Sequence, residues 1–138
     1  MAWSNVANIK GPTGSAGADG TDGTDGADGS YTGEAVVAIG TVTTSSTIDL
    51  TNGTIQTATL TASTACTFTM PTATAGQSFV LLLKQAASTG LGTATFTDVK
   101  WPAAGAPTVT ATAGKMDILS FIADGTNWYG SYVQGFTP

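Results

Sequence analysis

The chain has 138 residues and a formal net charge of −5, with only 9% charged residues against 41% hydrophobic ones. It contains four lysines, no arginine and no histidine. No basic stripe therefore exists to hold the phosphates of a nucleic acid or an anionic membrane surface, and we expect neither partner. Low charge with abundant threonine, alanine, glycine and valine is typical of a rigid β-rich protein, not of a disordered one.

Residues 1–10, MAWSNVANIK, form a first segment. Trp3, Val6 and Ile9 recur every three residues, which places them on one side of a short helix or of a regular extended peptide. A frayed terminus is the alternative. Ten residues cannot bury a tryptophan, so we predict that this segment docks onto another protein. It lacks the pattern of a secretory leader, and no run of apolar residues is long enough to span a membrane, so we expect synthesis in a cytoplasm.

Residues 11–31 form a second segment made of seven triplets, each beginning with glycine. The glycines are Gly11, Gly14, Gly17, Gly20, Gly23, Gly26 and Gly29. Three polyproline-II strands wound together leave room only for hydrogen at their axis, once in every three residues. A flexible linker would be glycine-rich without such strict spacing. The period predicts a homotrimeric, collagen-like triple helix, roughly 60 Å long at ~3.1 Å per residue.

This rod is expected to be weak on its own. Pro12 is the one residue of the repeat whose ring presets the polyproline-II backbone. The third position of four consecutive triplets is aspartate, with no lysine between them, and these carboxylates repel one another in a trimer although salt screens much of the effect. Their spacing fits neither an EF-hand loop nor a calcium-binding nonapeptide repeat, so we expect solvated acids and no metal. They are Asp19, Asp22, Asp25 and Asp28.

Residues 32–138 form the third segment, in which short strands alternate with turn signals. One of these signals, Asp124-Gly125, predicts a hairpin turn. About eight strands at this spacing predict a β-sandwich of jelly-roll type. The runs 79–83 and 118–122 are apolar on both faces, which indicates central strands or strands whose outer face meets a neighbouring subunit. The expected architecture is thus all-β, a collagen-like stalk followed by a jelly-roll-like domain that holds the trimer. The expected strands are 35–42, 47–50, 55–62, 66–70, 78–85, 93–99, 108–111, 116–123 and 128–134.

The residues for catalysis are largely missing. Without histidine there is no ordinary serine or cysteine triad, and zinc sites need histidine or several cysteines. Cys66, the one cysteine, shares a strand face with Phe68 and Met70 and is expected to be buried. Asp117 is expected to pair with a lysine or to face solvent. We therefore expect no catalytic residue, metal or cofactor, although the third segment holds the five acids Glu34, Asp49, Asp98, Asp117 and Asp124.

Trp128 and Tyr129 are the candidate binding aromatics. Adjacent residues of a strand point to opposite faces, so we expect one in the core and the other exposed. Packing in the core or at a subunit interface is the favoured interpretation, and a platform for a sugar ring is the alternative.

Two stretches resemble structural proteins of tailed bacteriophages. The opening MAWSNVANIKGPTG is similar to the start of many phage minor tail and fibre proteins, in which a short Trp- and Asn-containing peptide leads into collagen-like triplets. The C-terminal stretches VKWPAAGAPT, KMDILSF and DGTNWYG resemble a small β module that recurs in phage virion proteins. The resemblance implies a structural protein on the virion surface, anchored by its N-terminus to another virion protein, with no catalytic residues to carry over. Long receptor-binding fibres are usually several times larger.

Four interpretations follow. The first is a short trimeric fibre or spike. The second is a capsid decoration or head-fibre protein. The others are a collagen-like protein of a bacterial spore surface, and a carbohydrate-binding module whose partner is a host surface glycan. A docking peptide at residues 1–10 has no use in the last two.

Overall fold

The computed structural model describes residues 12–18, 20 and 33–138. The chain divides into two units, Met1–Tyr31 and Thr32–Pro138, and each is considered by itself. Residues 12–18 and 20 are exposed and belong to no helix or strand. Several residues singled out in the sequence lie outside the described part: Trp3, Val6, Ile9, Gly11, Gly23, Gly26 and Gly29.

The second unit is built from strands, so the all-β expectation is confirmed. The described residues contain no helix, and hence none that could cross a bilayer. The strands form a six-stranded sheet, here sheet A, in the order β1-β3-β5-β8-β9-β7, and a three-stranded sheet B in the order β2-β4-β6. The bounds are β1 Val37–Val42, β2 Ser45–Thr47, β3 Ile55–Leu60, β4 Ala65–Thr69, β5 Ser78–Lys84, β6 Thr93–Phe96, β7 Val99–Lys100, β8 Met116–Ala123 and β9 Trp128–Phe136.

The first six strands wind three times between the two sheets. Each turn places one strand in sheet A and the next in sheet B, so that β1, β3 and β5 run parallel, as do β2, β4 and β6. The expected jelly-roll connectivity is therefore wrong, because jelly rolls are made of antiparallel Greek keys. The physical reason is the return path. The chain returns to a sheet only after passing through the other sheet. Each new strand therefore runs parallel to the previous strand of its own sheet.

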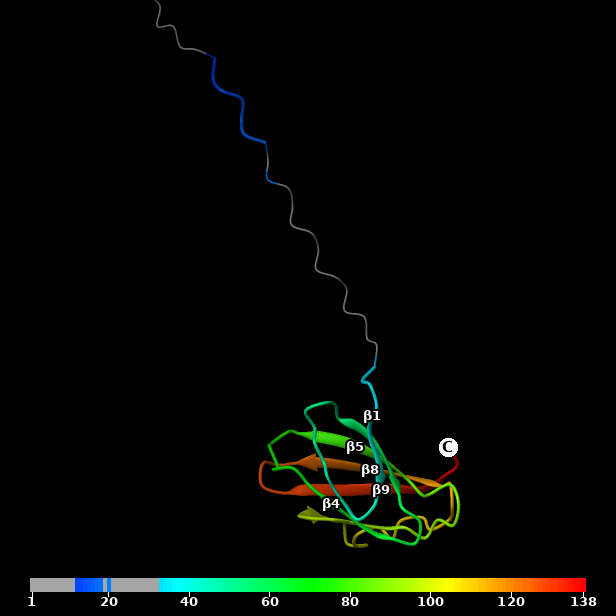
Figure 1. Cartoon of the computed structure of the whole chain (residues 1–138). Coiled ribbons are helices and arrows are strands. Elements are labelled where there is room, and N and C mark those ends of the chain that lie inside the picture. Colours follow the sequence, from blue (N-terminus) through cyan, green and yellow to red (C-terminus); the bar gives the residue numbers. More distant parts are fainter. Residues whose placement is uncertain (1–11, 19, 21–32) are drawn as a thin grey trace, which may run out of the picture. The chain divides into compact units, whose positions relative to one another are not determined.

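An antiparallel hairpin extends sheet A beyond the three turns. Strand β8 pairs with β5, and β9 pairs with β8, both in antiparallel register (Figure 1). The turn at Asp124 and Gly125 joins the two strands. Oδ1 of Asp124 accepts hydrogen bonds from the backbone amides of Thr126 at 2.8 Å and Asn127 at 2.7 Å. The hairpin turn expected from the Asp-Gly pair is confirmed.

The core lies between the two sheets and is rich in aromatic rings. Phe121 of β8 stacks on Phe79 of β5, with ring centroids 4.6 Å apart, and lies 5.4 Å from the ring of Phe96 in sheet B. Cys66 and Phe68 of β4 are buried facing the core, as expected, and the Cys66 thiol donates to the carbonyl of Val42. Because these side chains come from both sheets, the core depends on the sheets packing together.

Three strand assignments made from the sequence are wrong. Residues 108–111 are not a strand, and β2 ends at Thr47 instead of continuing to residue 50. The expected strand 93–99 is divided by a turn at residues 97–98 into β6 and β7, which belong to different sheets. In the first case the backbone amide of Thr110 donates to the carboxylate of Asp117 and not to a neighbouring strand. Val109 nevertheless packs into the core at 6% exposure, which explains why the segment resembles a strand in its pattern of apolar residues.

Candidate functional site

At the described positions of the repeat, neither a close contact nor the backbone angle requires glycine within a single chain. A Cβ added at Gly14, Gly17 or Gly20 would meet no atom within 4 Å, and none of the three has a positive φ. Glycine is normally required where the backbone is left-handed or where another group approaches closely. Neither condition holds for these three glycines within one copy of this chain.

Trp128 and Tyr129 point to opposite faces of β9, as expected. Trp128 is 2% exposed, its ring packs edge-on against Phe79, and its Nε1 donates to the carbonyl of Pro71 at 2.7 Å. It is therefore a core residue and is not presented to a ligand. Tyr129 is 43% exposed, and its hydroxyl donates to Oδ2 of Asp124. Of this pair, only Tyr129 remains a candidate for contact with another molecule.

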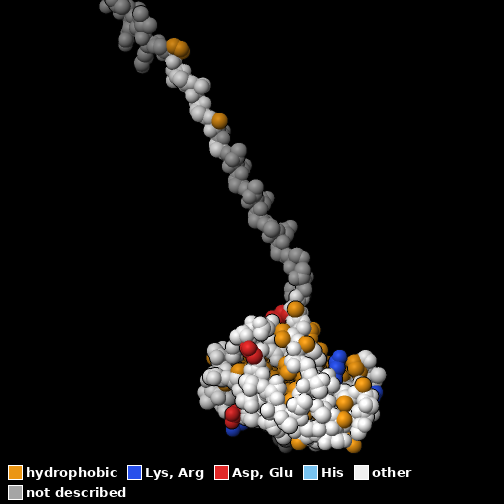
Figure 2. Space-filling view, in the orientation of Figure 1, with side chains coloured by type: hydrophobic (Ala, Val, Ile, Leu, Met, Phe, Trp, Pro, Cys, Tyr) orange, Lys and Arg blue, Asp and Glu red, His pale blue; other side chains and the backbone are white. Residues whose placement is uncertain are grey.

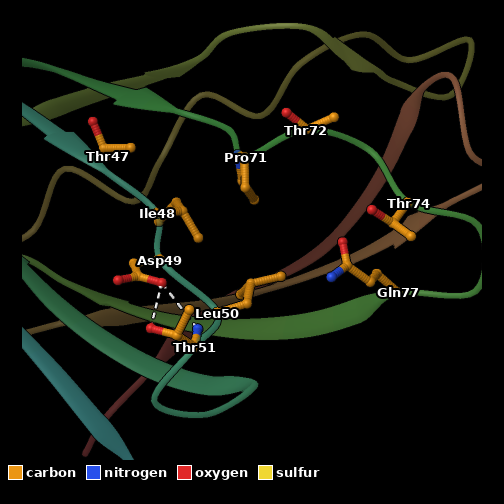
Figure 3. A pocket seen from close by; sticks show the side chains of 9 residues that line it. All are labelled: Thr47, Ile48, Asp49, Leu50, Thr51, Pro71, Thr72, Thr74 and Gln77. Atoms are coloured by element: carbon orange, nitrogen blue, oxygen red, sulfur yellow. Dashed lines mark hydrogen bonds between the residues drawn. The ribbon is translucent and has the colours of Figure 1, made fainter.

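An open hollow of about 710 Å³ lies where the links after β2 and β4 meet. Figure 3 shows Ile48, Pro71 and Gln77 pointing toward its middle. The sequence carried no signal for this hollow, since its walls come from links that are distant in the chain. The lining residues are Thr47, Ile48, Asp49, Leu50, Thr51, Pro71, Thr72, Thr74 and Gln77.

The side chains around this hollow offer little chemistry. Asp49 is the acid among the lining residues, and its Oδ1 already accepts hydrogen bonds from the amide of Thr51 at 2.9 Å and from its hydroxyl at 2.8 Å (Figure 3). These bonds, led by the backbone amide, lower the pKa of Asp49 below its usual range. No aromatic side chain lines the hollow, so it lacks the flat apolar surface on which a sugar ring stacks.

Four of the five acids of the second unit, all except Asp98, accept hydrogen bonds from hydroxyl or amide donors. The Glu34 carboxylate accepts from the Thr54 hydroxyl, as that of Asp49 does from Thr51. Charged side chains are few and scattered on the face seen in Figure 2. Within residues 12–18, 20 and 33–138, no three acids, cysteines or histidines gather where they could hold a metal ion.

Asp117 is a buried structural anchor, and this corrects the expectation that it pairs with a lysine or faces solvent. It is 3% exposed. Oδ1 accepts from the Thr110 hydroxyl at 2.6 Å and the Gly135 amide at 3.0 Å. Oδ2 accepts from the Thr110 amide at 2.7 Å and from Nε2 of Gln134 at 3.2 Å. The carboxylate thereby ties the loop before β8 to the end of β9. An acid within an apolar strand was the sequence signal for such a role.

We expect Asp117→Asn to destabilise the protein by about 3 kcal/mol, because both carboxylate oxygens accept from donors and an amide NH₂ would face two of them. The melting temperature should fall by roughly 10–20 °C, measured by calorimetry at constant protein concentration. Asp98→Asn is the matched control, since Asp98 sits at φ 55°, a conformation that asparagine tolerates equally well. Similar melting temperatures for the two variants would contradict the anchoring role.

Tyr129 and Asp124 form a coupled pair at the surface. The hydrogen bond to Asp124, with the charge of its carboxylate, raises the pKa of Tyr129. The pKa of Asp124 is lowered by the amides of Asn127 and Thr126 and by the Tyr129 hydroxyl. Asp124 therefore stays ionised while Tyr129 titrates, and the phenolate is disfavoured beside it.

An alkaline titration followed by tyrosine absorbance should show Tyr129 ionising above the usual pH range of a tyrosine. Asp124→Asn removes the neighbouring charge and should return this tyrosine toward its usual pKa. Tyr129→Phe identifies the signal, and Tyr132→Phe should leave it in place. An unchanged titration curve in Asp124→Asn would show that the pair is not coupled in solution.

No family model matches this chain, and no curated protein and no solved structure matches it either.

Proposed function

We propose that this chain is a non-enzymatic structural component of a phage virion, a short homotrimeric fibre or spike anchored by its N-terminus. The observation that carries the proposal is the unbroken glycine period from Gly11 to Gly29, which at Gly14, Gly17 and Gly20 has no cause within one chain. A triple helix supplies that cause, because a side chain at its axis would collide with the two neighbouring strands.

Each segment has its own role in this proposal. Residues 1–10, which include Trp3, Val6 and Ile9, dock onto another virion protein. Residues 11–31 form a passive spacer, whose aspartates and single proline make it dependent on the rest of the chain. Residues 32–138 supply a stable β-domain that holds the three copies together and faces outward. The likeness of the opening and C-terminal stretches to phage virion proteins supports the location.

Sedimentation equilibrium of the full chain at micromolar concentration tests the assembly. We expect a mass three times that of the 13.7-kDa chain, together with a polyproline-II circular dichroism signal that melts cooperatively. A monomer at these concentrations would overturn the proposal.

Imaging of virions that carry a tagged copy tests the location. A few labelled fibres or spikes per particle would support a fibre. Hundreds of copies over the capsid would favour a decoration protein, and particles without label would favour a spore-surface protein. A carbohydrate-binding module instead predicts glycan binding that is lost in Tyr129→Ala while the trimer remains.

A further inference from the structure

The two sheets of the β-domain differ in what they present to solvent. The outward side chains of sheet B are small and polar, among them Thr67, Thr69, Thr93 and Thr95. The hydroxyls of Thr67 and Thr95 lie 3.2 Å apart. A sheet with one face in water normally alternates apolar residues inward with polar residues outward, and sheet B follows this rule.

Sheet A departs from the rule over strands β8 and β9. Four large apolar or aromatic side chains point outward there, namely Ile122, Tyr129, Val133 and Phe136, with exposures of 57%, 43%, 61% and 39%. The register places Ile122 opposite Tyr129 and Phe136 opposite Met116. These four residues define the outer face of sheet A. Adjacent exposed residues of this size mark an interaction surface more often than scattered single ones do.

The apolar surface continues onto the centre of the sheet. Val133 lies opposite Ile118, and Ile118 lies opposite Leu82 of β5. Ile118 and Leu82 also point outward, and both are half-buried. A shallow hollow of about 370 Å³ lies beside this row. Its walls include the outward residues Val80, Ser120, Ile122, Tyr129 and Ser131. The surface is thus largely apolar and slightly concave, and its charges lie at the margins, where Lys100 is beside Tyr129 and Lys84 is beside Met116.

We infer that the outer face of sheet A is the surface through which copies of this chain contact one another in the trimer. This inference rests on the proposed function and adds the location of the interface. The glycine repeat ends at Tyr31 and β1 begins at Val37. Residues 32–36 span at most roughly 18 Å when extended. Three β-domains attached to one rod are therefore held close together, at an effective concentration of the order of millimolar.

A neighbouring copy is the occupant that this connectivity always supplies. The central part of a stable interface is apolar, contains aromatic residues and is depleted of charge. The outer face of sheet A has an apolar and aromatic centre with Lys84 and Lys100 at its margins, whereas the threonine-covered face of sheet B has no such centre. Burial of Ile122 and Val133 between copies would also explain why strands at the centre of sheet A are apolar on both sides.

The rate of thiol labelling in the full chain tests the inference. Val133→Cys places a thiol on the outer face of sheet A, and Leu91→Cys is the matched control. Leu91 is exposed to a similar extent, at 58%, but lies in the loop between β5 and β6. The natural Cys66 is buried and contributes little to the measured rate. Labelling is followed by mass spectrometry, and sedimentation of the same samples reports the number of chains.

We expect Leu91→Cys trimers to be labelled at the rate of a free thiol, and Val133→Cys trimers to be labelled at least about tenfold more slowly, which corresponds to about 1.4 kcal/mol of protection. A Val133→Cys chain that stays folded but no longer forms trimers would equally place this residue in the interface. Trimers in which both thiols react at the same rapid rate would overturn the inference and leave the trimer itself intact. A monomeric wild-type chain would instead overturn the proposed function.

A charge-bearing variant provides an independent measurement. Ile122→Asp together with Val133→Asp should raise the concentration at which the full-length trimer dissociates by at least about a hundredfold, since carboxylates in an apolar interface lose their hydration. Leu91→Asp should leave that concentration unchanged. Should the double variant fail to fold, Val133→Ser decides the question, because it removes apolar atoms from an exposed position. An unchanged dissociation concentration in Val133→Ser would contradict the inference.

Discussion

Removal of residues 32–138 is expected to leave the peptide 1–31 as single chains at about 37 °C, with complete loss of the trimer. The repeat contains one proline, Pro12, so little of its backbone is preset for the polyproline-II conformation. The aspartates Asp19, Asp22, Asp25 and Asp28 also repel one another between chains. Circular dichroism and sedimentation of the peptide measure this outcome.

A substitution within the glycine repeat separates the contribution of the triple helix to trimer assembly from that of the β-domain. Gly20→Ala in the full chain should disrupt the triple helix locally, because a methyl group does not fit at the axis. The β-domains should remain trimeric in this variant. If the peptide 1–31 forms a stable trimer, or if Gly20→Ala dissociates the whole protein, the rod would be the element that holds the chains together and the assignment of roles would be reversed.

Phe121→Ala is expected to cost about 3–5 kcal/mol of folding free energy, a large share of the total stability of a domain of this size. Phe121 is 2% exposed and contacts rings of both sheets, with centroids 4.6 Å from Phe79, 5.4 Å from Phe96 and 5.9 Å from Trp101. Its removal leaves a cavity that the surrounding strands can fill only in part. The melting temperature should fall by roughly 15–30 °C.

Ser120→Ala is the matched control for this change. Ser120 is the preceding residue of the same strand, but it is exposed on the other face of the sheet, so its substitution should alter the stability by less than about 0.5 kcal/mol. Denaturation in urea at one fixed chain concentration compares the three proteins. A small effect of Phe121→Ala would indicate that the two sheets are not joined through this ring.

Packing in the aromatic core also explains why residue 130 is a glycine. A Cβ at Gly130 of β9 would lie 2.5 Å from the ring of Trp101. The indole packs edge-on against Phe121 and Tyr132, so it cannot move away freely. Glycine is needed here for close packing and not for an unusual backbone angle. Nothing local in the sequence around Gly130 indicates this, because Trp101 is distant in the chain.

The local pattern of residues was sufficient for part of the structure. Alternation of apolar and polar residues predicted most strands, the Asp124-Gly125 pair predicted the hairpin turn, and the opposite directions of Trp128 and Tyr129 followed from their being neighbours in a strand. These features depend on a few successive residues, whose geometry is the same in any β-protein. The glycine period predicts the number of chains for a similar reason, since the rule for an axial residue is local.

Tertiary structure decided the remaining features. The parallel winding of β1 to β6, the anchoring of Thr110 by Asp117, and the side of sheet A on which Ile122 and Val133 lie all depend on which distant segments meet. Alternation within a strand does not specify its neighbour or the direction of that neighbour, because parallel and antiparallel partners accept the same pattern of side chains. The sequence by itself therefore determined most of the strands and the glycine period, whereas long-range pairing determined how the strands are connected in space and which face of sheet A carries Ile122 and Val133.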